Sequence, residues 1–516
     1  MAVKPPTLDD LSRIAAKFNM GLPDSELRAY KAVIDPLLAT YDRLDEMPEP
    51  SLEVKYPNRP NWRPAGQENP LGAWYWRTDI KGATHGPLAG KTLAIKDNVC
   101  VAGVPLMCGT RLLEGYVPTI DATIVTRILD AGGTILGKAV CESLCFSGNS
   151  NTAECGIVRN PYDLSRTPGG SSTGSGALVA DGSVDMAIGA DQAGSIRIPS
   201  AFSGIYGMKP TYGLVPYTGI GPMELTIDHT GPMARSVADL ALLLEVIAGP
   251  DGLDPRQRTG IVAEKYTAAL NGDVKGMRVG VVKEGFGRTD NPASEKDVDE
   301  AVRESAHALS RLGCEVREIS IPIHRDGVHI WSAIACEGIP EFVFEQGGAG
   351  RHWKGYYPTG MIEAFTQAIR EHGDYLSITA KTFRMLGGYM NEQYRGRYYA
   401  KAQNLSRPLA AAYDDALKQC DILVMPTATI KAAKIPLASD PLEAQIVTAI
   451  GAISNTCPFN VTGHPALNVP CALSAGLPVG MMFVGRMGED ATILKVAGAF
   501  QDNIFAAPLP PSHKSL

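Results

Sequence analysis

The sequence is poor in clustered positive charge and in long apolar runs, and these shortages exclude two classes of partner. Its 48 Lys and Arg residues are scattered among 55 Asp and Glu residues, which gives a net charge of −7. Nucleic acids and anionic membranes attract clustered positive charge, so neither is expected as a partner. No apolar run reaches the roughly 20 residues that span a bilayer, and the segment Met1–Pro6 has no apolar signal core. We therefore predict a cytoplasmic location.

Cysteine is scarce for a fold held by disulfides, with 10 residues in 516. Cys336 and Cys457 lie inside apolar runs, as is typical of reduced thiols in a cytosolic protein. Cys141, Cys145 and Cys155 form the only local cluster. Their spacing fits no common zinc pattern and no paired histidines follow, so the sequence predicts no metal site.

The length of 516 residues indicates two or three domains. Near the N-terminus, Thr7 can cap a helix with Asp10 three positions on. Apolar residues spaced by three and four between 27 and 44 predict a second helix, which Pro36 kinks or interrupts. Six prolines between 48 and 70 indicate an extended connector. We expect residues 1–80 to form this helical and extended segment.

The rest of the chain alternates short apolar strands with helical patterns, which is typical of an α/β core. Strands are predicted at 93–95, 134–136, 277–282, 314–319, 421–426 and 478–484, and helices at 122–129 and 298–312. The βαβ pattern that begins near 277 looks like a separate unit. We predict a catalytic core of residues 81–260 plus 400–516, and an inserted small α/β domain at 261–399.

The segment 167–176 reads TPGGSSTGSG, and so many glycines and hydroxyls cannot build an apolar core. It leads into an apolar, helix-like run from Ala177, so its N–H groups would lie at a helix start. One interpretation is the G-x-S-x-G elbow of an α/β-hydrolase esterase, with Ser172 as nucleophile. The residues before it include Pro168 and are unsuited to the central strand that an elbow needs, so this alternative is the weaker one.

A second motif, GADQAGSIRIP at 189–199, places small residues directly before Ser195. Small residues let successive backbone N–H groups face one substrate oxygen, as an oxyanion hole requires. A serine nucleophile needs a base, and a lysine can serve when it is uncharged. Lys96 ends the apolar strand 93–95, where burial disfavours the ammonium form. The residues thus allow a serine–lysine mechanism.

These residues together resemble the amidase signature family. The family pattern is matched by KDN at 96–98, GGSSTG at 169–174 and GSIRIP at 194–199, with Ser171 and Ser195 24 positions apart. Further matches lie at 163–168, 207–211, 228–233, 425–427 and 459–466. The resemblance covers roughly 85–260 and 405–490, and it implies a mixed central sheet covered by helices.

The resemblance also implies the roles of individual residues. Ser195 is expected to be the acylated nucleophile, and Ser171, in a cis peptide linkage, to bridge it to Lys96 as the final base. The family needs no metal and no organic cofactor. Asp191 and Arg197 are expected to shape the loop rather than to take part in the chemistry.

The expected oxyanion turn consists of Gln192, Ala193, Gly194 and Ser195, and Cys145 is expected to line the acyl side of the site. The turn departs from the family pattern, because Ala-Gly replaces the usual Gly-Gly and Gln192 replaces the commoner Thr or Ile. These changes put the shape of the oxyanion turn in question but leave intact the proton relay from Ser195 through Ser171 to Lys96.

The D-Q-x-G-S form and the N-terminal extension are most similar to bacterial amidases that accompany nitrile hydratases. That similarity implies a homodimer, to which the N-terminal helices contribute, and hydrolysis of aliphatic, aromatic or arylalkyl carboxamides to carboxylate and ammonia. We expect the substrate pocket to be built from 261–399 and the run near Ile450. The alternative within the family is a glutaminyl-tRNA-type amidotransferase subunit, which the extension and the lack of basic patches disfavour.

Overall fold

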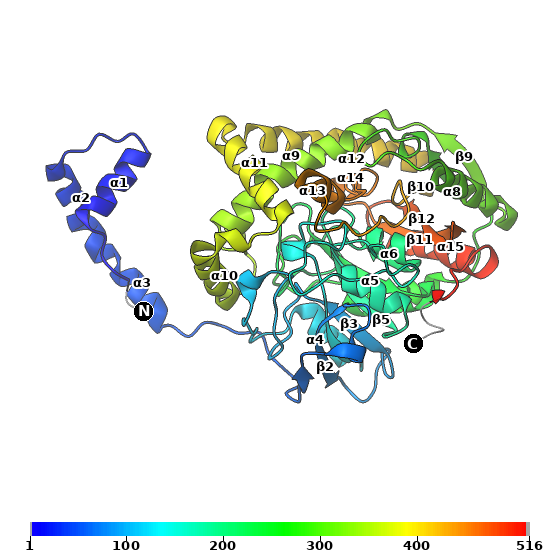
Figure 1. Ribbon diagram of the computed structural model, residues 1–516, viewed down its shortest axis with the longest axis horizontal. Coiled ribbons are helices and arrows are strands. Elements are labelled where there is room, and N and C mark those ends of the chain that lie inside the picture. Colours follow the sequence, from blue (N-terminus) through cyan, green and yellow to red (C-terminus); the bar gives the residue numbers. More distant parts are fainter. Residues whose placement is uncertain (1–2, 512–516) are drawn as a thin grey trace. The chain divides into compact units, whose positions relative to one another are not determined.

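The computed structural model describes residues 3–511, and its internal contacts divide the chain into two units, Met1–Glu53 and Val54–Leu516 (Figure 1). The first unit contains α1 (Leu8–Lys17), α2 (Asp24–Leu37) and α3 (Ala39–Glu46). The predicted cap is confirmed, because Thr7 and Asp10 form a reciprocal capping box. The predicted interruption is confirmed as well, since Pro36 lies in the last turn of α2 and a new helix begins at Ala39.

The second unit is built on one mixed sheet of 12 strands, in the order β1-β2-β4-β3-β5-β7-β6-β11-β12-β10-β8-β9. Strand β3 is parallel to β4 and β5, and β8 is parallel to β9 and β10, while the other pairs are antiparallel. The mixed sheet agrees with the expected fold class. The strands are β1 (Asn61–Trp62), β2 (Trp74–Lys81), β3 (Thr92–Lys96), β4 (Thr134–Ala139), β5 (Met186–Asp191), β6 (Tyr206–Lys209), β7 (His229–Ala234), β8 (Arg278–Val282), β9 (Glu315–Ile319), β10 (Ile422–Pro426), β11 (Ala466–Ser474) and β12 (Leu477–Val484).

Helices cover this sheet, and within residues 3–511 no helix is long and apolar enough to cross a membrane. They are α4 (Thr123–Asp130), α5 (Thr173–Ala180), α6 (Arg197–Ser203), α7 (Val237–Ile247), α8 (Lys296–Ala308), α9 (Gly327–Pro340), α10 (Thr359–Glu371), α11 (Ile378–Tyr394), α12 (Arg397–Gln419), α13 (Leu442–Ile450), α14 (Pro458–Thr462) and α15 (Asp490–Asn503). Helix α5 is buried along its whole length. That burial explains its composition, because only Gly, Ser, Thr and small apolar residues leave room for close neighbours on every side.

The segment 261–399 shares the sheet with the rest of the second unit. Its strands β8 and β9 extend the sheet beyond β10, while its helices α9 and α11 lie beside each other, with α12 packed against α9 (Figure 1). Strand β2 begins within the expected segment 1–80 and belongs to the sheet, and the boundary between the two compact units lies after Glu53. The expected division into a core and an inserted domain stays a prediction.

Candidate active site

Three segments that are far apart in the sequence meet at the C-terminal ends of the parallel strands β3 and β5. They are the end of β3, the loop before α5, and the turn between β5 and α6. The Nζ atom of Lys96 lies 2.9 Å from Ser171 Oγ and 3.1 Å from the carbonyl oxygen of Ala190. Lys96 and Ser171 are both completely buried. The structure thus brings together the lysine and the bridging serine that the sequence singled out.

The surroundings of Lys96 differ from those of a neighbouring buried lysine. Lys138, on the adjacent strand β4, pairs with Asp97 at 2.9 Å, and both side chains are buried. Within residues 3–511, no carboxylate forms an ion pair with Lys96. A buried ammonium without a carboxylate partner is unfavourable, whereas a neutral amine can accept a hydrogen bond from a hydroxyl.

The loop before α5 is tied to the turn that carries Ser195. The Gly170–Ser171 peptide bond is cis, as the resemblance implied. The backbone N–H of Ser172 donates to the carbonyl oxygen of Ser195 at 3.1 Å, so the two serine-bearing segments are held side by side. The hydroxyl of Ser172 is buried and bonded to the backbone of Ala190, which leaves it in a structural position rather than facing a substrate.

The turn after β5 is organised by one buried ion pair. The carboxylate of Asp191 pairs with Arg197 at 2.9 Å, with both side chains inaccessible to solvent. It also accepts hydrogen bonds from the backbone N–H groups of Gly194 (2.7 Å) and Ile196 (3.1 Å). Burial alone would raise the pKa of Asp191, but the Arg197 guanidinium and the hydrogen bonds hold it below its usual range. These contacts support the expectation that both residues shape the loop.

The predicted oxyanion turn contains one residue whose N–H is already in use. Gly194 donates to Asp191, whereas the N–H groups of Gln192, Ala193 and Ser195 have no acceptor within residues 3–511. Gly194 instead contributes a backbone conformation that the turn requires. Its φ of +136° is a conformation that side-chain-bearing residues rarely adopt, and an added Cβ would lie 2.4 Å from Thr456 Oγ1.

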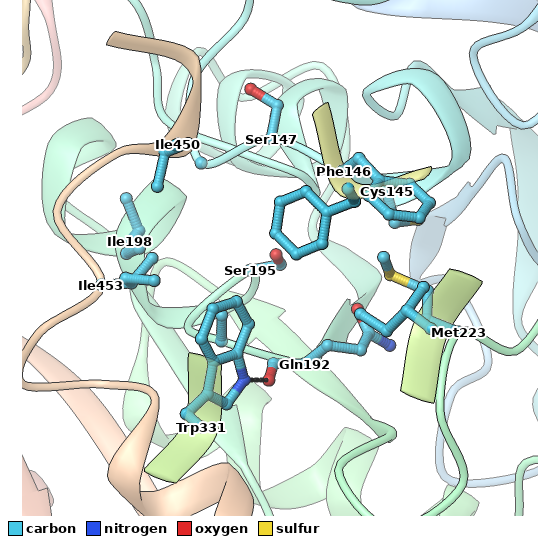
Figure 2. A pocket seen from close by; sticks show the side chains of 14 residues that line it. Cys145, Phe146, Ser147, Gln192, Ser195, Ile198, Met223, Trp331, Ile450 and Ile453 are labelled. Carbon is cyan, nitrogen blue, oxygen red and sulfur yellow. Dashed lines mark hydrogen bonds between the residues drawn. The ribbon is translucent and has the colours of Figure 1, made fainter. Parts of the chain in front are cut away.

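Ser195 opens onto a cavity whose wall is mostly apolar. Figure 2 shows Phe146 and Trp331 on either side of Ser195. The lining residues are Cys145, Phe146, Ser147, Gly148, Gln192, Ala193, Ser195, Ile198, Met223, Trp331, Ile339, Phe383, Ile450 and Ile453. Segment 261–399 and the run near Ile450 therefore both contribute to the wall, as the sequence analysis expected. Phe146, Met223 and Trp331 were not singled out from the sequence, because nothing local marks an apolar residue as lining a cavity.

The side chain of Gln192 is fixed at the cavity wall and extends toward Met223 (Figure 2). Its Nε2 donates to the hydroxyl of Tyr217 at 2.9 Å, and its backbone oxygen accepts from Trp331 Nε1 at 2.7 Å. Its Oε1 is buried without a hydrogen-bond partner in the described residues. The nearby Asp228 interacts with Gln192, and burial raises the pKa of Asp228 to about 8. The site thus holds one unused acceptor.

Cys145 lies where the resemblance placed it, in the cavity wall and in contact with the hydroxyl of Ser171. Hydrogen bonds from the thiols of Cys108 and Cys141 hold the pKa of Cys145 well below its usual range. Cys145 also lines a second cavity, of about 440 Å³, together with Cys108 and Met223. The sequence cluster included Cys155, which is not part of this group of thiols.

A mixed α/β sheet that presents a serine beside a buried lysine–serine pair defines a class of hydrolase in which lysine, rather than histidine, provides the base. The chain belongs to the Amidase family, because the model of that family matches residues 71–494.

Similar proteins agree with this assignment. An enantioselective amidase from Rhodococcus rhodochrous is 47% identical over 519 residues, which cover 100% of this chain and 99% of that protein. A glutamyl-tRNA(Gln) amidotransferase chain from Methanosarcina mazei is 35% identical, covering 82% of this chain and 86% of that protein. The structure of a 6-aminohexanoate cyclic dimer hydrolase with its substrate is similar with a TM-score of 0.71 at 27% identity, covering 83% and 88% of the two chains. The protein is an amide hydrolase of the amidase signature type.

Proposed function

We propose that this enzyme hydrolyses primary carboxamides with aryl or arylalkyl acyl groups, through an acyl-enzyme on Ser195. The observation that carries the proposal is the 2.9 Å contact between Lys96 and Ser171 beside a serine that faces an apolar cavity. A neutral amine in that position can draw a proton through the Ser171 hydroxyl.

In the first half-reaction, Ser195 Oγ attacks the amide carbon, and its proton moves to Ser171 Oγ while the Ser171 proton moves to Lys96 Nζ. The negative oxygen of the tetrahedral intermediate is held by backbone N–H groups of the turn, for which Gln192, Ala193 and Ser195 are the available donors. Ser171 then donates its proton to the leaving nitrogen and recovers one from Lys96. The C–N bond breaks and ammonia departs.

In the second half-reaction, water attacks the acyl carbon of the ester on Ser195. The proton that water loses passes to Ser171, and the Ser171 proton again passes to Lys96. When the C–O bond breaks, Ser195 Oγ takes a proton back from Ser171, and Lys96 returns to the neutral form. The cycle consumes one water molecule and releases one carboxylic acid and one ammonia, which exchange a proton in solution to give carboxylate and ammonium.

The cavity favours the proposed acyl groups. Phe146, Trp331 and Phe383 line the cavity with apolar, aromatic surface, which suits an aromatic ring. Gln192 lines this cavity, and its Oε1 is buried without a partner in the described residues; an N–H group on the leaving nitrogen of a bound amide would donate to it. An ester of the same acid offers no such donor.

We further propose that the protein is a cytoplasmic homodimer and that it acts on the amide product of nitrile hydration. The N-terminal unit supports the dimer, because Phe18, Tyr30, Val33 and Leu37 expose more than half of their surface. All ten cysteines are unpaired, which is typical of a reducing compartment. The nitrile pathway rests on the family resemblance and on the enantioselective amidase of Rhodococcus rhodochrous.

A hydrolysis screen tests the substrate class. Acetamide, benzamide, 2-phenylpropionamide, an anilide and a hydrazide are incubated with the purified chain alone, and released ammonia or amine is measured. We expect the two aromatic primary amides to have the highest kcat/KM. Intact-mass spectrometry after rapid quenching should show one acyl group on the wild type and none on Ser195→Ala. Failure to release ammonia without added subunits would instead favour the amidotransferase alternative.

A further inference from the structure

Three cysteine side chains converge next to the proposed relay. The Sγ atoms of Cys108, Cys141 and Cys145 lie within 4.8 Å of one another, and all three residues are buried and free of disulfides. They come from three places: the loop after β3, the residues after β4, and the short 3₁₀ turn Ser143–Cys145. Such a gathering of soft ligand atoms is chemically distinct from a single buried thiol.

The backbone holds these thiols together through specific contacts. Cys108 donates its N–H to Asp97 Oδ2 at 2.8 Å and accepts at its carbonyl oxygen from the N–H of Leu144, also at 2.8 Å. At Gly109, with φ +67°, an added Cβ would lie 2.3 Å from the carbonyl oxygen of Cys141. Glycine is therefore required at that point for the loop after β3 to approach the residues after β4.

Two of the three cysteines also have an uncommon backbone conformation. Cys108 has φ +50° and Cys145 has φ +64°, in the left-handed region that residues with a Cβ rarely adopt. Strained conformations of this kind persist where the surrounding structure fixes them, and they concentrate at ligand sites. Here both strained residues direct their thiols to the same point.

We propose that Cys108, Cys141 and Cys145 form a binding site for a thiophilic d¹⁰ cation, such as Cu⁺ or Cd²⁺. Metal–sulfur bonds of about 2.3 Å in a trigonal arrangement place the sulfur atoms about 4 Å apart, which the observed cluster accommodates with small side-chain adjustments. Soft cations prefer thiolates to the oxygen ligands of the surroundings. Cys108 and Cys145 also line the second cavity, so two of the three proposed ligands border a space beside the cluster.

Occupation of the site inhibits the enzyme, and this second part rests on the proposed function. Three thiolates and one divalent cation carry one net negative charge next to Lys96, with which Cys145 already interacts electrostatically. A metal bound to Cys145 lies next to the Ser171 hydroxyl, which Cys145 contacts and through which the proposed relay passes its protons. Coordination also withdraws Cys145 Sγ from the Ser171 hydroxyl. The result is loss of kcat that a chelator reverses.

The test is an anaerobic titration of the reduced, full-length protein with Cd²⁺, followed by the thiolate-to-metal charge-transfer absorption in the ultraviolet and by proton release. We expect one Cd²⁺ per chain in the wild type and in the matched control Cys457→Ala, whose thiol is buried elsewhere. We expect the absorption to be lost in Cys141→Ala. Cys108→Ala is the second variant, should the first fail to fold.

Activity is measured in the same samples. Cd²⁺ should inhibit the wild type and Cys457→Ala, while Cys141→Ala or Cys108→Ala should keep at least half of its own metal-free rate. Equal absorption in the wild type and in both cluster variants would overturn the site. A charge-transfer band without any change in rate would keep the metal site and overturn its effect on catalysis, which separates the failure of this inference from that of the proposed relay.

Discussion

Lys96 and Lys138 lie on neighbouring parallel strands, both completely buried, yet only Lys138 has a carboxylate partner in the described chain. This difference makes Lys96 suited to proton transfer and Lys138 suited to stabilising the fold. A pair of substitutions distinguishes these two roles. Lys96→Met keeps the length of the side chain but removes the amine. We expect kcat to fall by about 10²–10⁴-fold, the usual contribution of a general base, with little change in the melting temperature.

Lys138→Met is the matched control. It leaves Asp97 buried and unpaired, which typically costs about 3–5 kcal/mol of stability. Differential scanning fluorimetry should therefore show a large drop in melting temperature for Lys138→Met and not for Lys96→Met. Wild-type kcat in Lys96→Met would contradict the relay.

Substitutions at Ser195 and at Ser172 predict two different outcomes. Ser195→Ala should abolish acyl-enzyme formation, because it removes the attacking oxygen. Ser172→Ala removes only hydrogen bonds to Ala190, so we expect an acylated protein and a loss of about 1 kcal/mol in stability. Intact-mass spectrometry of quenched reactions checks both. An esterase that uses Ser172 would give the reverse pattern.

Gln192 provides a test of how the leaving amine is recognised. Gln192→Leu keeps the approximate volume but removes the unpaired acceptor Oε1, together with the Nε2 group that donates to Tyr217. Loss of one hydrogen bond of about 1 kcal/mol should lower kcat/KM for benzamide by roughly 5- to 10-fold. Methyl benzoate lacks the donor and serves as the control substrate, whose kcat/KM should change much less. Equal losses for amide and ester would show that the substitution disturbs the turn instead.

Asp228 predicts a pH dependence of stability. Burial raises its pKa to about 8, above the value near 3.9 of an unfolded aspartate. Between these values the native protein binds the proton more tightly than the unfolded chain, so this carboxyl favours folding at low pH, and that contribution is lost as the pH rises toward about 8. Asp228→Asn should flatten this part of the stability profile, measured as the urea midpoint at about pH 5 and about pH 8. If stability changes with pH as steeply in Asp228→Asn as in the wild type, other titratable groups cause the dependence.

Much of the site was accessible from the sequence because its motifs are local. Lys96, Ser171 and Ser195 each lie in a short segment whose glycines or strand pattern mark it, and the structure brings the first two within 2.9 Å. The strands β3, β4, β8, β10 and β12 were also predicted, since continuous apolar runs of that length are typical of buried strands, and β9 was predicted from the alternation of its residues.

What the sequence did not reveal depends on contacts across the fold. The engagement of the Gly194 N–H by Asp191 changes which donors are available to the oxyanion, and no local pattern shows it. Cys108 joins the thiol cluster from the loop after β3, while Cys155, closer in sequence, stays outside it. Strand β2 follows a proline-rich connector, where the turn residues hide the strand pattern.

The N-terminal unit carries the last prediction, which concerns the proposed homodimer. Tyr30, Val33 and Leu37 follow one another at helical spacings of three and four on α2, and each exposes more than half of its surface. An apolar stripe of this kind on a small helical unit is more stable when a second surface covers it. Val33→Glu places a charge within the stripe, and we expect it to shift the protein from dimer to monomer in sedimentation velocity. Val262→Glu is the matched control, because Val262 is 70% exposed, close to the 65% of Val33, and lies in the other unit. It should leave the assembly unchanged. A wild type that sediments as a monomer, or a Val33→Glu variant that stays dimeric at the same concentration, would remove the N-terminal helices from the dimer interface.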